Sequence, residues 1–124
     1  MLVRRQAAGF TLIELLVVLA AIGLLVGIVA PRYARHVDQA REVTLKHNLA
    51  GVRDSIDKFY TDRGRFPSGL DELVRTEYLR ALPIDPITNR EDTWTPVPDA
   101  QGGVRDIRSG APGVGMDGTA YASW

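Results

Sequence analysis

One charged side chain lies inside a long apolar stretch, where a charge is costly unless an opposite charge compensates it. Residues 10–30 read FTLIELLVVLAAIGLLVGIVA and contain a single charge, Glu14, and one other polar side chain, Thr11. A carboxylate in a membrane helix costs on the order of 2.5–3.5 kcal/mol at the bilayer centre and less near an end. The stretch holds no basic residue. We therefore expect the partner of Glu14 to be a free amine at the start of this helix in another copy of the chain.

The other chemistry-bearing residues do not form a catalytic pattern. His36 and His47 are eleven residues apart, whereas two metal ligands on one helix are usually three or four apart, so both are predicted to be solvated or packed. The chain has no cysteine, which excludes thiolate nucleophiles, disulfides and Cys-based zinc sites. The carboxylates are scattered, and the glycines of residues 110–115 are typical of a loop. We predict that the protein is not an enzyme.

Length and charge narrow the class of protein further. The 124 residues suffice for one domain, and 15 basic residues balance 15 acidic ones. A general nucleic-acid binder would normally carry a basic excess, so no nucleic-acid partner is expected.

The apolar stretch has the length of a membrane span. Residues 10–30 would extend roughly 30 Å as a helix, the thickness of a bilayer core. Arg4 and Arg5 precede it without any acid, which predicts a cytoplasmic N-terminus. The residues after the stretch would then lie on the opposite side of the membrane. A cleaved secretory signal is disfavoured because the stretch is too long for one. The candidate cut after Ala30 would also place the bulky Ile28 where a small residue is required, with Pro31 directly after the cut. A plain single-pass anchor is the stronger alternative, but it leaves Glu14 unexplained.

A helical period continues beyond Pro31. Apolar residues spaced four and three apart form one stripe: Leu45, Leu49, Val52, Ile56 and Phe59. The residues between them predict a solvated face: Arg41, Glu42, Lys46, Arg53, Asp54, Asp57 and Lys58. We expect one helix over residues 11 to about 60, ended by Gly64 as a C-cap with Pro67 beyond.

Shorter elements follow the long helix. Ser68 is predicted to cap a short helix over residues 68–74, and Asp85-Pro86 indicates a turn. Residues 93–97 and 104–108 are candidate strands of a hairpin, with the turn at residues 101–103 and with Pro96 favouring an edge position.

The N-terminal residues resemble a known motif. Residues 8–14, AGFTLIE, together with the apolar helix behind them, resemble the type IV prepilin motif. The resemblance implies that a prepilin peptidase cuts after Gly9 and methylates the new amine of Phe10. It also implies that Glu14 pairs with the N-terminal amine of a neighbouring subunit during assembly. Pro31 is either a helix boundary at the membrane surface or a kink that lets the subunit stretch.

The head resembles one branch of this family. Residues 60–67 (YTDRGRFP), 69–73 (GLDEL) and 79–86 are similar to the major, G-type pseudopilin of type II secretion systems. The resemblance implies an α+β, pilin-like fold: one long N-terminal helix, its first half transmembrane, packed on a small periplasmic head with a short antiparallel β-sheet. It implies three parts, a leader (1–9), a transmembrane and assembly helix (10–30) and a head (31–124).

The implied function is structural. The chain would be a subunit of a type II secretion pseudopilus, a filament that grows from the bacterial inner membrane and drives protein export across the outer membrane. Implied partners are further copies of the chain, minor pseudopilins, the prepilin peptidase, the inner-membrane assembly platform and membrane lipid. The alternative is a minor type IV pilin for adhesion, motility or DNA uptake. The absence of a cysteine for a C-terminal disulfide loop favours the pseudopilin.

The C-terminal part departs from the G-type pattern. The family usually reads Asp-Pro-Trp-Gly-Asn where this chain has DPITN at residues 85–89, and it closes with an acidic loop that binds calcium. Asp106, Ser109 and Asp117 are the remaining candidate ligands here, whereas calcium prefers six to eight oxygens, several of them charged. We therefore expect no cofactor, and a C-terminal loop held by hydrogen bonds and by packing of Tyr121 and Trp124.

Overall fold

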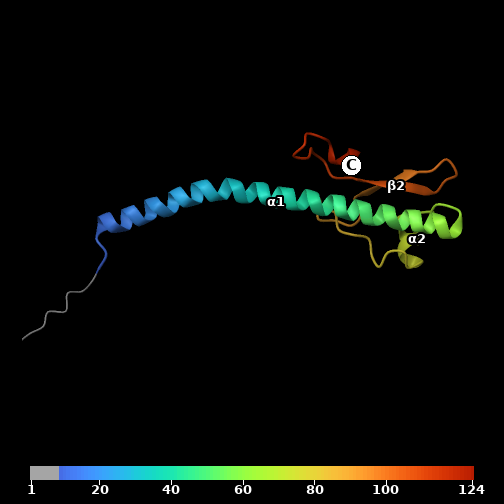
Figure 1. The fold of residues 1–124 in the computed structure, drawn as a ribbon, viewed down its shortest axis with the longest axis horizontal. Coiled ribbons are helices and arrows are strands. Elements are labelled where there is room, and N and C mark those ends of the chain that lie inside the picture. Colours follow the sequence, from blue (N-terminus) through green and yellow to red (C-terminus); the bar gives the residue numbers. More distant parts are fainter. Residues whose placement is uncertain (1–8) are drawn as a thin grey trace, which may run out of the picture. The chain divides into compact units, whose positions relative to one another are not determined.

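The computed structural model describes residues 9–124, so Arg4 and Arg5, on which the predicted orientation rests, lie outside the described residues. Along the chain come helix α1 (Leu12–Arg63), helix α2 (Leu70–Arg75), strands β1 (Trp94–Pro98) and β2 (Val104–Ser109), and the 3₁₀ helix η1 (Tyr121–Ser123), most of them labelled in Figure 1. The chain divides after Val37 into two compact units.

Helix α1 confirms the single long helix predicted over residues 11 to about 60. At its start the hydroxyl oxygen of Thr11 accepts the backbone N–H of Glu14 at 3.2 Å, as an N-cap does. At its end Gly64 has φ +68° and its N–H donates to the carbonyl of Tyr60 at 2.8 Å, the left-handed C-cap that glycine allows. Pro31 lies inside the helix, so the alternative of a helix boundary there is wrong.

The described part of the first unit, residues 9–37, exposes most of its apolar side chains. Phe10 is 85% exposed, Leu12 81% and Leu24 68%. The N-terminal part of α1 is long and apolar enough to cross a membrane, judged by length and composition, and none of its most apolar window is buried. This part of the helix therefore gains no stabilisation from packing within the described residues.

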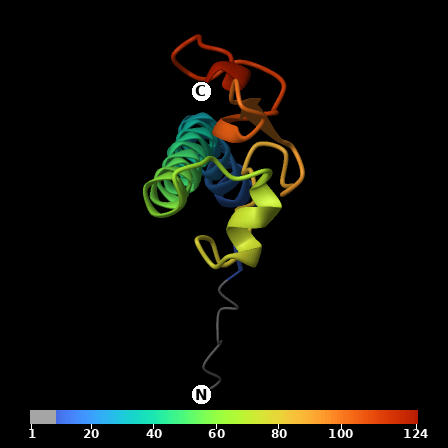
Figure 2. The same cartoon turned by 90° about the vertical axis from the view of Figure 1, so that its right-hand side faces the viewer.

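The second unit, from Asp38 to Trp124, has a hydrophobic core built on α1. The predicted stripe is confirmed, since all five of its members are at most 1% exposed. Leu70 and Leu73 of α2 and Trp94, Val104 and Ile107 of the hairpin complete the buried cluster. Within this unit α2 and the hairpin lie on one side of the helix (Figure 2). Phe59 also meets the ring of Tyr78 edge-on, with centroids 5.3 Å apart.

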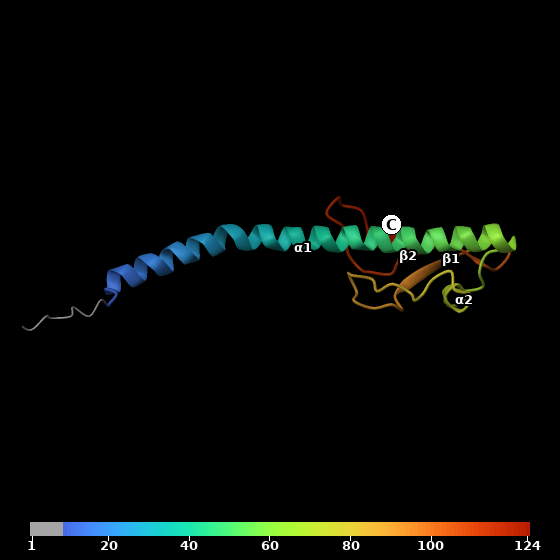
Figure 3. The same cartoon turned by 60° about the horizontal axis from the view of Figure 1, so that its bottom comes forward.

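Strands β1 and β2 form the predicted hairpin, with β1 shifted by one residue from its expected bounds and β2 ending one residue later than expected. They pair antiparallel, with Trp94 opposite Ser109 and Pro96 opposite Ile107. Figure 3 labels both strands of the hairpin. The indole N–H of Trp94 donates to the carbonyl of Pro83 at 2.8 Å, which ties the hairpin to the preceding loop. Proline has no N–H to donate to a neighbouring strand, so it is tolerated in an edge strand. In this two-stranded sheet β1 is an edge strand, as Pro96 predicted.

The predicted cap by Ser68 is wrong. The N-cap position of α2 is Gly69, which makes no side-chain cap bond. Ser68 instead donates its N–H and its hydroxyl to Glu72, at 2.6 and 2.7 Å, while Arg65 binds the other carboxylate oxygen at 2.6 Å. These bonds, led by that from Arg65, lower the pKa of the Glu72 carboxyl to about 2. The buried carboxylate of Glu72 therefore holds Arg65 and Ser68, which precede α2, against that helix.

A fully buried acid forms the turn predicted at Asp85-Pro86. The side chain of Asp85 is 0% exposed, and one oxygen accepts the N–H of Ile87 at 2.8 Å. The other accepts the hydroxyl of Ser109 at 2.7 Å. Asp85 thus joins the loop after α2 to the end of β2 through hydrogen bonds that satisfy its oxygens, and no cation among residues 9–124 pairs with it.

Candidate functional site

The residues of the predicted cleavage site precede α1. Gly9 and Phe10 lie outside any helix or strand, and both are exposed. The peptide bond between them is therefore not part of the helical hydrogen-bond ladder. An accessible peptide outside a helix is the form in which a peptidase can bind its substrate.

Glu14 lies in the first turn of α1 and is exposed. A negative charge there interacts favourably with the helix dipole, which offsets part of the cost of an acid in an apolar segment. Within residues 9–124 no basic side chain forms an ion pair with it. Its carboxylate is thus available to a cation from outside the described chain.

The second unit contains a polar cluster that the sequence did not reveal. Glu42, predicted to be on a solvated face, is 9% exposed. One of its carboxylate oxygens accepts the N–H of Met116 at 2.7 Å and the hydroxyl of Tyr121 at 2.9 Å. Burial and this hydrogen bond raise the pKa of Tyr121. The prediction of solvation was wrong for Glu42, because its partners lie more than seventy residues away.

Arg53, also predicted to be solvated, joins the same part of the fold. Its guanidinium donates to Asp106 at 2.8 Å and to the carbonyls of Ile107 and Trp124, both at 2.9 Å. Lys46 lies between Glu42 and Arg53 along α1, with its ammonium 4.6 Å from the ring centroid of Trp124. One face of α1 therefore binds both ends of the segment from β2 to Trp124.

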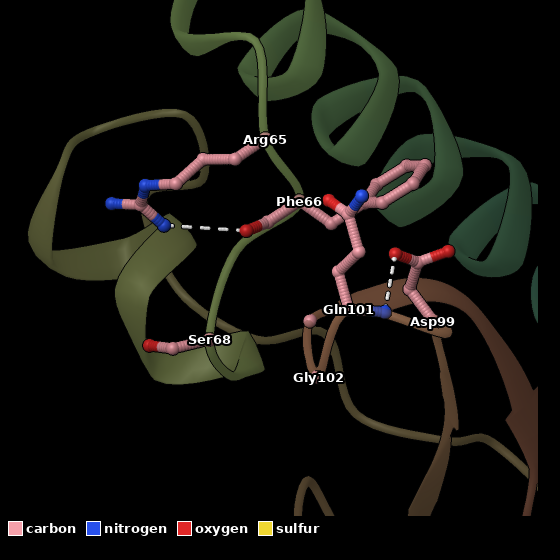
Figure 4. Close-up of a pocket in the computed structure, with 7 residues that line it drawn as sticks. Arg65, Phe66, Ser68, Asp99, Gln101 and Gly102 are labelled. Atoms are coloured by element: carbon pink, nitrogen blue, oxygen red, sulfur yellow. Dashed lines mark hydrogen bonds between the residues drawn. The ribbon is translucent and has the colours of Figure 1, made fainter.

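A cleft of about 320 Å³ lies between the start of α2 and the hairpin (Figure 4). Its polar groups are engaged: Arg65 donates to the carbonyl of Phe66 at 3.2 Å, and Asp99 accepts the N–H of Gln101 at 3.1 Å. The lining includes one hydroxyl, Ser68, which donates to Glu72. The carboxylate of Glu72 is also bound by Arg65, which lowers its pKa and makes it a weak general base for the Ser68 hydroxyl.

Comparison with known proteins places the N-terminal residues in a described motif. Residues 4–30 match the family model "Prokaryotic N-terminal methylation motif". The chain is 33% identical to type II secretion system core protein G of Pseudomonas aeruginosa over 69% of this chain and 72% of that one. The chain belongs to the type II secretion system core protein G family.

Other relatives agree with this assignment. Core protein G of Aeromonas hydrophila is 29% identical over 94% of this chain and 88% of its own. The fimbrial protein EcpC of Eikenella corrodens is 30% identical, over 67% of this chain and 58% of its own. The core protein G relatives of Pseudomonas aeruginosa and Aeromonas hydrophila both cover more of each chain than EcpC does, so the type IV pilin alternative is not favoured. No solved structure matches the chain significantly.

The calcium loop implied by the resemblance to this family does not fit the side chains present. Asp106 is paired with Arg53, and the hydroxyl of Ser109 donates to Asp85 and accepts the N–H of Ala111. Asp117 accepts the N–H and the hydroxyl of Thr119, at 3.0 and 2.6 Å. The three candidate ligands have three separate sets of partners. Among the residues that the structure describes, no three acids or histidines gather as a metal site would require.

Proposed function

We propose that this core protein G family member is a structural subunit of a type II secretion pseudopilus, with no catalytic role of its own. The observation that carries the proposal is the exposed apolar surface of the first unit, with the acid Glu14 in its first turn. Such a surface is stable only in lipid or against other apolar helices. Family membership makes other copies of the chain the natural partner.

Processing prepares the chain for assembly. The prepilin peptidase cuts after Gly9, removes the leader (residues 1–9) and methylates the amine of Phe10. The match to the methylation motif and the exposed, non-helical Gly9–Phe10 peptide support this step. The mature subunit then has an assembly helix (10–30) and a head (31–124).

Glu14 selects the register of the filament. The carboxylate pairs with the N-terminal amine of Phe10 in the neighbouring subunit, which compensates both charges in an apolar surrounding. The spacing of Gly23 and Gly27, four residues apart, suits close helix packing, and no other part of the described chain covers either position. Pro31, which has no N–H to donate within α1, is the point at which we expect the helix to kink.

The chain crosses the inner membrane once. Arg4 and Arg5 keep the N-terminus cytoplasmic, and the head lies in the periplasm. From there subunits enter the filament at the assembly platform, alongside minor pseudopilins. The filament grows from the inner membrane and drives protein export across the outer membrane.

Two measurements on the same cells test processing and orientation. Intact-mass analysis of protein extracted from cells with the peptidase should show loss of residues 1–9 and one added methyl group. Protease added to spheroplasts should digest the head while leaving a cytoplasmic marker intact. An uncut N-terminus, or a head protected until the inner membrane is opened, would contradict the proposal. The matched control is Gly9→Leu, which should stay uncut in the same orientation.

A further inference from the structure

The C-terminal segment, residues 110–124, is attached to α1 by direct side-chain bonds. Its own hydrogen bonds close a small loop: the N–H of Gly115 donates to Thr119 at 2.7 Å, and the indole of Trp124 donates to the hydroxyl of Thr119 at 2.6 Å. The rings of Tyr121 and Trp124 meet edge-on at 5.0 Å. These local bonds shape the segment, while bonds to α1 and a bond from Arg108 of β2 to the carbonyl of Ser123, at 2.7 Å, fix it on the head.

Glu42 makes the central attachment. A single carboxylate oxygen holds two donors of the segment, the N–H of Met116 and the hydroxyl of Tyr121, in a position that is 9% exposed. Hydrogen bonds to a charged acceptor in such surroundings are among the stronger ones in proteins. Glu42 thus holds two residues of the loop, Met116 and Tyr121, close together. A bound cation would have the same effect on a loop by coordinating several of its oxygens.

Arg53 makes the second attachment. Its guanidinium bridges the carboxylate of Asp106 and the backbone oxygens of Ile107 and Trp124. It joins strand β2 to the last residue of the segment and compensates the charge of Asp106. A cation already occupies the place at Asp106 where a metal ion would otherwise bind.

A positive charge beside Asp117, the ammonium of Lys46, also opposes a metal ion there. Asp117 lies beside Lys46, which lines the same cleft and contributes to lowering its pKa after the two bonds from Thr119. A divalent ion at Asp117 would have to approach this ammonium and displace Thr119. Asp106 of β2 and Asp117 of the loop therefore each have protein partners that compete with a metal.

We propose that Glu42 and Arg53 of α1 hold residues 110–124 in place of a divalent cation, so that the head folds and keeps its C-terminal loop ordered without calcium. The bonds run from α1 to the loop directly, and their strength does not depend on the calcium concentration. Stability of the head should accordingly be indifferent to chelators.

The test uses the full chain in detergent micelles, with melting temperature and amide hydrogen exchange measured in EGTA and in millimolar calcium. The wild-type melting temperature should agree between the two buffers. Glu42→Ala should lower it by about 5 °C or more and should speed exchange of the Met116 amide about tenfold or more, in both buffers. Glu42→Gln, which keeps an acceptor oxygen, should give a smaller change in the same amide.

Asp54→Asn is the matched control, because Asp54 is an exposed acid of the same helix whose partner, Lys58, is four residues away. It should change neither the melting temperature nor the exchange of Met116. A saturable rise of several degrees with calcium in the wild type would overturn the proposal. So would recovery of Glu42→Ala by calcium, or unchanged Met116 exchange in Glu42→Gln and Glu42→Ala alike.

Discussion

Two phenylalanines show the contrast between the two units of the chain. Phe10, in the first unit, is 85% exposed, whereas Phe59, in the second, is 0% exposed. Both belong to regular apolar patterns of the sequence, but only the second pattern finds partners within the described residues. The second unit therefore has a hydrophobic core of its own, while the apolar side chains of the first find no such core within the described residues.

This contrast predicts that substitutions will separate into two classes. Changes in residues 38–124 should alter the free energy of unfolding of the head. Changes in residues 9–37 should leave that free energy unchanged and should act on membrane insertion and assembly.

The largest effect on stability is expected at the centre of the core. Phe59→Ala should lower the free energy of unfolding by about 3–5 kcal/mol, because it leaves a cavity between α1, Tyr78 and the rest of the core. Urea unfolding of the full chain in detergent, followed by tryptophan fluorescence, measures this loss. Unaltered extraction with the membrane fraction would be the expected control result. A loss below about 1 kcal/mol would show that the head is not held by this core.

A smaller but still large effect is expected at Gly110. A Cβ there would collide with the backbone carbonyl oxygen of Thr93, which cannot move without disturbing the start of β1. Gly110→Ala should therefore destabilise the head by about 3 kcal/mol. The matched control is Gly51→Ala in α1, where a Cβ meets nothing within 4 Å and should stabilise the helix by roughly 0.5–1 kcal/mol. The same urea titration measures both, and equal midpoints for the two variants would be inconsistent with the structure.

An intermediate effect is expected at Glu72, with a defined dependence on pH. Its folded-state pKa of about 2 lies below the ordinary value of 4.5. The contribution is therefore fully present above pH 4.5 and is lost as the pH falls towards 2. Glu72→Gln should cost about 1–2 kcal/mol at pH 7, because the Arg65 partner is 52% exposed and solvent screens the pair. Unfolding curves from pH 7 to pH 2 should converge for wild type and variant, and parallel curves would refute this role.

The smallest effect on the head is expected in the first unit. Leu24 is 68% exposed, so Leu24→Ala removes no packing within the described residues. The free energy of unfolding of the head should change by less than about 0.5 kcal/mol. A loss comparable to that of Phe59→Ala would mean that the two units do not differ as described.

Local and periodic features were predictable from the sequence. The buried stripe from Leu45 to Phe59, the cap at Gly64 and the hairpin around Gly102 all depend on residues close in sequence, and all are confirmed. These features follow from helical and strand periods and from the conformational freedom of glycine.

Features that depend on distant partners were not predictable. Glu42 and Arg53 have the composition of a solvated face, yet they bind residues 53 to 79 positions away. Gly110 was interpreted as a residue typical of loops, although glycine is needed there because the backbone of Thr93 leaves no room for a Cβ. Ser68 has the right type for a helix cap, but Glu72 takes both of its donors. Charge and turn propensity describe one residue at a time, whereas these roles arise when the fold brings two segments together.

The role proposed for Glu14 can be tested by one substitution. Glu14→Leu removes an acid from the apolar segment and should make that segment a better membrane anchor. In cells lacking a wild-type copy, the variant should be cut after Gly9, stay in the membrane, and fail to cross-link to neighbouring subunits or support secretion. A plain anchor protein would tolerate the change or gain from it. Normal cross-linking and secretion by Glu14→Leu would contradict the proposal that the carboxylate binds the amine of the next subunit.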